Sequence, residues 1–153
     1  MKYLIMVMVA LLASSCNGQD MKNSKILKSN SFLIGTWSGE GSMLNNQLHK
    51  ELGTLGIEVK FNKDGTISGS IGDAQFKNAK LSQSNYGFEL KTELNNWVKE
   101  SYRLDKDRLV VLFVFPEKSD STLKQSDANF HLKSNFFFDF TMKVGGVKLI
   151  KVA

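Results

Sequence analysis

Apolar and polar residues alternate along several stretches of the chain, with the period of a β-strand that has one buried face. In residues 57–62 (IEVKFN) the alternation is complete, and it resumes over residues 66–71. The intervening residues 62–65 (NKDG) have turn chemistry, and Gly65 can adopt positive φ. These segments predict a β-hairpin with Ile57, Val59, Phe61 and Ile71 on one face.

The same pattern continues toward the C-terminus. Strands are predicted at residues 74–83, 88–94 and 97–104, separated by short turns at 85–87, 95–96 and 105–107. Residues 109–115 (LVVLFVF) are apolar at every position, which predicts a strand covered on both faces. After a charged loop at 116–127, further strands are predicted at 130–133, 135–144 and 147–152. The last two would be joined by a tight hairpin at Gly145-Gly146.

Short turns without long helical crossovers favour an antiparallel meander. A meander with two exposed edges removes them by closing on itself. We therefore expect an all-β domain in which roughly 8–10 strands close into a small β-barrel. A two-sheet β-sandwich is the alternative.

One short helix is considered near residues 44–52. Leu44, Leu48, Leu52 and Leu55 have the spacing of one apolar helical stripe, and Gly53 could end such a helix. The alternative is that residues 43–48 extend the first strand and turn at Asn45-Asn46.

The N-terminus has the composition of a targeting signal. A charged start (Met1-Lys2) precedes an apolar run over residues 3–12 and small residues at 13–15. The run is too short to cross a hydrocarbon core of about 30 Å as a helix. Residues 1–15 are therefore expected to be a removable signal peptide. Cys16, the single cysteine of the chain, follows directly.

Residues 12–16 (LASSC) resemble the lipobox of bacterial lipoproteins, with Leu12 one position further from the cysteine than is usual. The resemblance implies that Cys16 is the lipid attachment site and that the protein is anchored in the bacterial cell envelope, at the outer membrane. The alternative is an unpaired thiol after an ordinary signal peptide. Residues 16–31 are polar and are interpreted as the lipidated N-terminus and a flexible tether. Residues 32–153 are expected to fold alone as the β-barrel domain.

A second resemblance concerns the start of that domain. Residues 32–37 (FLIGTW) contain a Gly-x-Trp similar to the one that opens the first strand in the lipocalin and fatty-acid-binding superfamily. In the fatty-acid-binding branch a helical insertion follows this strand, where residues 44–55 lie here. Residues 64–74 also resemble a segment of envelope lipoproteins of Bacteroidota. These likenesses imply a barrel fold and a bacterial envelope protein.

Catalytic motifs are not found in the sequence. His49 and His131 are far apart and have no metal-ligand spacing, and no Gly-x-Ser-x-Gly or phosphate loop occurs. We expect no metal, no cofactor and no enzymatic activity. The least implausible catalytic arrangement is a carboxylate pair drawn from Glu40, Asp73, Glu89, Glu93 and Glu100. The net charge is +5 with dispersed lysines, which argues against nucleic acid as a partner.

The aromatic content gives the remaining indication of function, since the chain has 11 phenylalanines, four of them within residues 136–140 (FFFDF). A packed core without a ligand would explain them, but a small barrel could also hold one apolar molecule, such as a fatty acyl chain or an isoprenoid. In the predicted strand at 97–104, Glu100 shares the face of Val98, Tyr102 and Leu104, which would point it inward. The alternative is that this strand faces the other way near its start, with Trp97 packed instead. The candidate ligand-binding residues are Phe61, Ile71, Phe88, Leu90, Phe138 and Phe140, with Glu100 and Tyr102 as polar contacts.

The alternative function is a non-catalytic module that binds another envelope protein through apolar surface near residues 109–115.

Overall fold

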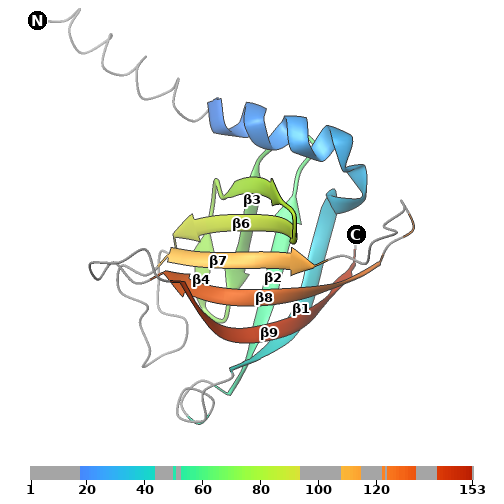
Figure 1. Cartoon of the computed structure of the whole chain (residues 1–153). Coiled ribbons are helices and arrows are strands. Elements are labelled where there is room, and N and C mark those ends of the chain that lie inside the picture. Colours follow the sequence, from blue (N-terminus) through green and yellow to red (C-terminus); the bar gives the residue numbers. More distant parts are fainter. Residues whose placement is uncertain are drawn as a thin grey trace, which may run out of the picture.

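The computed structural model describes residues 18–43, 50, 53–93, 108–114, 122, 124–133 and 141–152. Residues 18–29 form a helix, which is followed by a short 3₁₀ turn and nine β-strands (Figure 1). The elements are η1 (Ser31–Leu33), β1 (Gly35–Met43), β2 (Thr54–Phe61), β3 (Ile67–Ile71), β4 (Ala74–Phe76), β5 (Lys80–Ser84), β6 (Gly87–Glu93), β7 (Arg108–Val114), β8 (Gln125–Lys133) and β9 (Thr141–Lys151).

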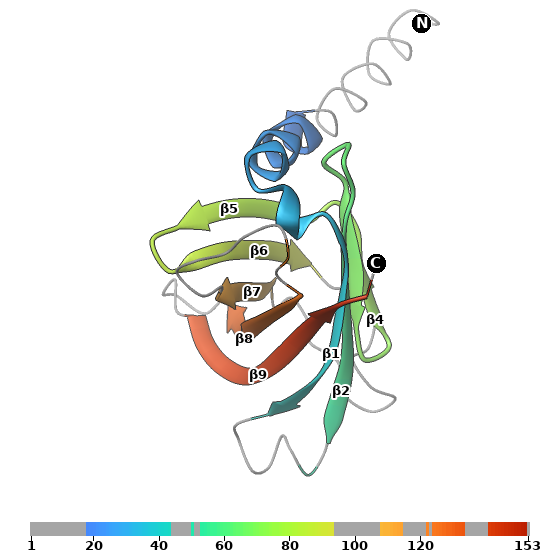
Figure 2. The ribbon, with the colours of Figure 1, turned by 90° about the vertical axis from the view of Figure 1, so that its right-hand side faces the viewer.

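All nine strands belong to one antiparallel sheet, in the order β4-β3-β2-β1-β9-β8-β7-β6-β5. Because the first strand pairs with the last, the sheet curls into a half-barrel, in which β5 to β9 cross one side and β1 and β2 run up the other (Figure 2). The expected all-β antiparallel meander with a barrel-like shape is confirmed. Its two ends are β4 and β5, which do not pair with each other in the described part of the chain.

The hairpin expected around Gly65 is present. Exposed and buried residues alternate without interruption along β2, and Phe61 is only 1% exposed. Gly65 has φ +98°, and its N–H donates to the Asn62 carbonyl at 3.1 Å. The Asp64 carboxylate accepts hydrogen bonds from the Thr66 amide (2.9 Å) and hydroxyl (2.6 Å), which tightens the turn.

The single strand expected over residues 74–83 is wrong, because the chain divides there into β4 and β5. Asn78 lies between them with φ +55°. Phe76 and Ala79 are both buried although they are three positions apart, and a continuous strand would put them on opposite faces. β4 pairs only with β3, and β5 only with β6, so this break separates the two ends of the sheet.

The hairpin expected at Gly145-Gly146 is also wrong. Both glycines lie inside β9, where Gly146 is paired with Ser42 of β1 and with Asn129 of β8. β8 has a register shift between Phe130 and His131, directly opposite. Glycines inside a strand often mark a bulge or a sharp bend, and β9 curves strongly in Figure 2. β8 begins at Gln125, within the segment expected to be a loop.

Residues 18–29 do not form a flexible tether, so that interpretation and the domain boundary at Phe32 are corrected. The helix lies over one end of the sheet (Figure 1), and Asn23 and Leu27 are fully buried. Asn23 and Leu27 are one helical turn apart, with Ile26 beside them, so they share the face that packs on the sheet. The folded domain includes residues from Gly18 onward. No described helical segment is long and apolar enough to cross a bilayer.

Some expectations fall wholly or partly outside the described residues. These are the signal peptide at residues 1–15, the strand at 97–104, residues 135–140 of the strand at 135–144, and most of the helix near 44–52, of which Lys50 is described as helical. Leu55, the last residue of the proposed leucine stripe, belongs to β2 and is buried. In β7, Phe113 is fully buried but Val114 is 38% exposed, so this strand is not covered on both faces at Val114.

Candidate ligand-binding site

Four of the expected ligand-binding residues are described, and the curled sheet brings all four to its interior. Phe61, Ile71, Phe88 and Leu90 are between 0% and 6% exposed and belong to one hydrophobic core. The Phe61 ring packs edge-on against Phe113 with 5.6 Å between centroids. The other candidates, Glu100, Tyr102, Phe138 and Phe140, lie outside the described residues, as does the lipid attachment site Cys16.

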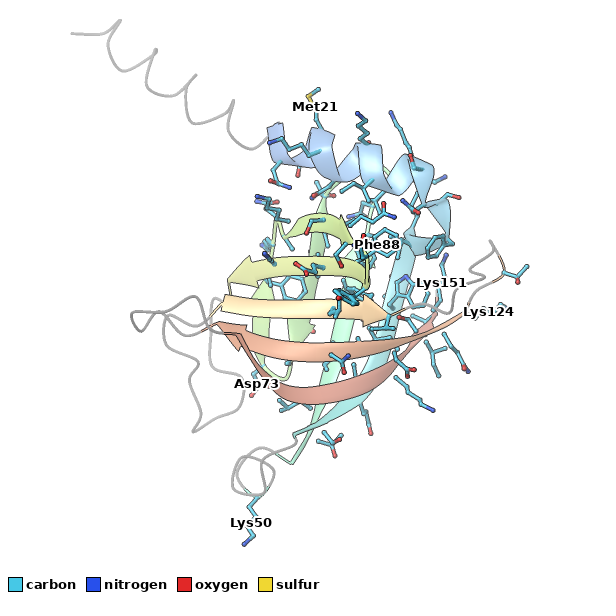
Figure 3. The ribbon with its side chains drawn as sticks, in the orientation of Figure 1. Met21, Lys50, Asp73, Phe88, Lys124 and Lys151 are labelled. Carbon is cyan, nitrogen blue, oxygen red and sulfur yellow. The ribbon has the colours of Figure 1, made fainter. Side chains whose placement is uncertain are left out.

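Phe88 lies near the end of the sheet where η1 packs (labelled in Figure 3). Its ring meets that of Phe32 edge-on, with centroids 6.0 Å apart. Phe32 is half-buried and directly precedes Leu33, which is fully buried. The apolar interior therefore continues from the strands to the segment that joins the helix to β1.

The helix closes this end of the half-barrel through Asn23. The Asn23 amide nitrogen donates to the carbonyls of Gly65 and Ala79, each at 2.9 Å. Its Oδ1 accepts from the Leu81 backbone N–H at 3.0 Å and from the Gln19 side chain at 2.8 Å. These four bonds satisfy both donors and both lone pairs of the amide. One side chain thus joins the helix to the β2–β3 turn and to the start of β5.

The helix approaches the β2–β3 turn so closely that a Cβ at Gly65 would collide with the carbonyl oxygen of Asp20. The Ser24 hydroxyl also donates to the Lys63 carbonyl at 3.5 Å, a long bond. Because Gly65 also has positive φ, a side chain at this position is excluded on two grounds. The absence of a side chain at Gly65 therefore allows the helix to lie directly on the hairpin.

A second set of contacts joins η1 and β1 to the end of β9. Trp37 is fully buried, and its Nε1–H donates to the Leu33 carbonyl at 2.8 Å. Lys151, near the end of β9, lies with its ammonium 5.8 Å from the Trp37 ring centroid and donates to the Phe32 carbonyl at 2.8 Å. Burial lowers the pKa of Lys151.

Sequence reasoning singled out Trp37 and missed Lys151. A signal was present, because Lys151 follows Val147 and Leu149 at spacings of two, in phase with the buried face of β9. An inward lysine at the end of a strand indicates a partner, and here the partner is the Trp37 ring together with a backbone carbonyl.

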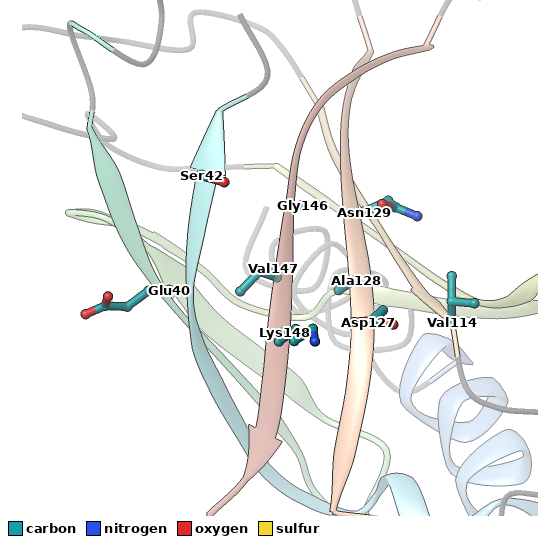
Figure 4. Close-up of a pocket in the computed structure, with 9 residues that line it drawn as sticks. All are labelled: Glu40, Ser42, Val114, Asp127, Ala128, Asn129, Gly146, Val147 and Lys148. Atoms are coloured by element: carbon teal, nitrogen blue, oxygen red, sulfur yellow. The ribbon is translucent and has the colours of Figure 1, made fainter. Parts of the chain in front are cut away.

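A depression of about 710 Å³ lies on the outer face of the sheet, over β1, β9, β8 and β7 (Figure 4). Its polar lining comes from Glu40, Ser42, Asp127, Asn129 and Lys148, and its apolar lining includes Val114. The strand register sets Lys148 opposite Asp127 on β8. On β1, Gly41 pairs with Val147 of β9, so the preceding residue, Glu40, lies beside Lys148. Lys148 therefore has one acidic residue on each side, Glu40 on β1 and Asp127 on β8.

The carboxylates considered as a catalytic pair do not come together where they are described. Glu40 is on β1, Glu89 is on β6 and pairs with Lys91 at 3.6 Å, and Asp73 is exposed in the β3–β4 turn. Glu93 has only its backbone described, at the end of β6. Within the described ranges no cluster of three or more histidine, cysteine or acidic residues could hold a metal ion.

Comparison of the chain with protein-family models, with curated proteins and with solved structures found no match.

Proposed function

We propose that the protein is a lipoprotein of the bacterial cell envelope, anchored at the outer membrane through Cys16, and that its lipocalin-like domain binds a small apolar molecule without catalysis. The observation that carries the proposal is the shared interior position of Phe61, Ile71, Phe88 and Leu90, which come from three strands and belong to one apolar core. The lipobox-like residues 12–16 support the anchor.

The shape of the sheet supports a binding role. The ends of the half-barrel, β4 and β5, are short strands of three and five residues that do not pair with each other in the described chain. Asn23 joins the helix to the β2–β3 turn and to the start of β5, and the edge strands β4 and β5 offer a route by which a narrow molecule could reach the interior. An apolar ligand would extend the contacts that the core residues already make with one another.

The chemistry of the interior favours an acyl or isoprenoid chain over a sugar or nucleotide. The residues nominated from the described strands have hydrocarbon or phenyl side chains, so a hydroxyl-rich ligand would lose hydrogen bonds to water without replacement. The amide of Asn23 offers no compensation, because its hydrogen-bonding capacity is already used within the protein.

The test uses full-length protein purified from the membranes of its host. Native mass spectrometry should show an additional small apolar molecule, and the delipidated protein should bind cis-parinaric acid saturably. Leu90→Phe adds volume on the inner face of β6, and its neighbour Lys91→Phe adds the same ring on the outer face. We expect at least a tenfold loss of probe affinity for the first variant and little change for the second. Non-saturable binding, or equal effects of the two variants, would refute a site in the interior.

A second candidate function is a protein-interaction module, and the outer depression is the observation that favours it. The depression combines exposed Val114 with charged groups of both signs, as the rim and core of a polar interface do. The double variant Glu40→Gln, Lys148→Gln removes one charge of each sign and keeps the net charge. Loss of a co-purifying envelope protein from this variant, with cis-parinaric acid binding unchanged, would favour the interaction module.

A further inference from the structure

We propose that the exposed face of helix 18–29 lies against anionic lipid headgroups, so that this face and the acyl anchor together fix how the domain stands on the membrane. The inference rests on the proposed anchor at Cys16. It adds a second membrane contact, made by described residues of the folded domain.

The helix has two distinct faces. Asn23 and Leu27 are fully buried against the sheet. The opposite face carries Met21, which is 72% exposed and points away from the sheet in Figure 3, together with three exposed lysines at positions 22, 25 and 28. Spacings of three residues keep these lysines on one side of a helix. The outward face is therefore basic, with one apolar side chain near its N-terminal end.

Neighbouring segments add to the positive charge. The helix itself carries three lysines and a single acid, Asp20. It contacts the β2–β3 turn and Ala79, the residue before β5. The turn presents exposed Lys63 and Asp64, and exposed Lys77 and Lys80 lie on either side of Ala79 in sequence. Lysines attract an anionic leaflet when they lie within about one Debye length, roughly 8 Å, of its surface. These lysines would lie within that distance once the helix-covered end of the domain is brought to the membrane.

The distance to the anchor brings it there. Cys16 is two residues before Gly18, the first described helical residue, so the two Cα atoms are at most about 7 Å apart. An acylated Cys16 would therefore hold the first turn of the helix in the headgroup region. The helix is about 18 Å long, so the domain can only tilt about this point or lie with the whole basic face on the lipid. The positive charge favours the second arrangement.

The orientation would extend to the whole domain, because the helix is not a loose appendage. The hydrogen bonds of Asn23 and the burial of Leu27 fix it to the sheet. The end of the molecule that carries Lys50 lies opposite the helix in Figure 3 and would then face away from the bilayer.

The experiment places the acylated full-length protein in vesicles of phosphatidylcholine, with or without phosphatidylglycerol. A fluorophore is attached through Met21→Cys on the helix or Lys50→Cys at the far end, and quenching by spin-labelled lipids reports its depth. One variant replaces three helix lysines by glutamine at positions 22, 25 and 28. The matched control makes the same change in charge with exposed lysines of the sheet, at positions 60, 91 and 148.

We expect strong quenching at position 21 in anionic vesicles and little at position 50. Each helix lysine should change the ratio of surface-bound to detached helix by roughly fivefold, so the triple variant should lose about 100-fold while the control variant keeps the contact. Added salt should mimic the triple variant. An unquenched label at position 21 in anchored protein, or equal behaviour of the two variants, would overturn the inference.

Failure of the anchor gives a different result. If mass spectrometry shows Cys16 without an acyl group and vesicles of phosphatidylcholine alone do not retain the protein, the proposed anchor is wrong. Salt-sensitive binding of that protein to phosphatidylglycerol vesicles, lost only in the helix variant, would still support the basic face. If the protein without an acyl group does not bind phosphatidylglycerol vesicles, the proposed lipid contact of the basic helix face is refuted as well.

Discussion

Replacement of Asn23 by alanine should destabilise the whole domain, although the sequence around residue 23 is polar and predicts a linker. The change removes the side chain that joins the β2–β3 turn to the start of β5. It leaves the carbonyls of Gly65 and Ala79 and the N–H of Leu81 without these partners in a buried region.

The magnitude follows from those three groups. A buried polar group left without its partner costs about 1–3 kcal/mol, and water that enters the vacated space recovers part of this. We expect a loss of about 2–5 kcal/mol in the free energy of unfolding. For a chain of this size, about 1 kcal/mol lowers the melting temperature by roughly 2–4 °C, so the midpoint should fall by about 5–15 °C.

Thermal unfolding followed by circular dichroism measures the effect. Ser24→Ala is the matched control, because its neighbouring hydroxyl makes only the 3.5 Å bond to Lys63 and should change stability by no more than about 0.5 kcal/mol. Asn23→Asp keeps an acceptor for Leu81 but turns a carboxylate toward two carbonyl oxygens, so it should be no better than alanine at neutral pH. Hydrogen exchange adds a local readout, since the Leu81 amide should lose protection in both Asn23 variants.

The result that would refute this reasoning is a melting temperature for Asn23→Ala within about one degree of that of Ser24→Ala. Unchanged exchange at the Leu81 amide would lead to the same conclusion. Either outcome would mean that the helix is not joined to the sheet through Asn23.

Four further outcomes are expected. Cys16→Ser should release the protein from the membrane fraction of its host, and full retention would contradict the lipid anchor. Trp37→Ala should cost about 3–5 kcal/mol in a urea titration, because the ring is fully buried and its N–H is bonded. Gly65→Ala should destabilise strongly and Gly56→Ala little, because a Cβ meets the helix backbone at the first position and open space at the second. The hydrogen bonds of Thr66 lower the pKa of Asp64, so its contribution to stability should be present above the ordinary value of 3.8 and lost as the pH falls through the lower folded value. A stability profile measured at acidic pH should flatten in Asp64→Asn.

Period-two patterning predicted much of the sheet because local sequence decides which face a strand buries. β2, β3 and the turn between them follow from alternation and from Gly65, and the interior positions of Phe61, Ile71, Phe88 and Leu90 follow from the same phase. The sequence therefore predicted which residues of the candidate site point into the interior. Whether inward residues leave space for a ligand depends on packing between distant strands, which alternation does not encode.

The errors occurred where tertiary contacts override a local signal. Gly145-Gly146 has the chemistry of a hairpin, but pairing with β1 and β8 on both sides keeps β9 extended through it. Asn23 is a polar residue whose partners in the sheet are 42 to 58 positions away in sequence, so no local rule identifies it as buried. A weak helical signal was nevertheless present in the spacing of Asn23, Ile26 and Leu27.

The position of the helix also decides which form of the protein can test the ligand hypothesis. A fragment that begins at Phe32 would lack Asn23 and Leu27, and would expose the backbone groups of the β2–β3 turn and of β5 that the helix covers. We expect this fragment to melt below Asn23→Ala, because it loses the buried Leu27 side chain in addition to the same hydrogen bonds. Failure of such a fragment to bind cis-parinaric acid would then report a disturbed interior and not the absence of a site. Equal melting temperatures of the fragment and of the chain that begins at Cys16 would show instead that the helix contributes nothing to the fold, and would make the shorter form a valid reagent.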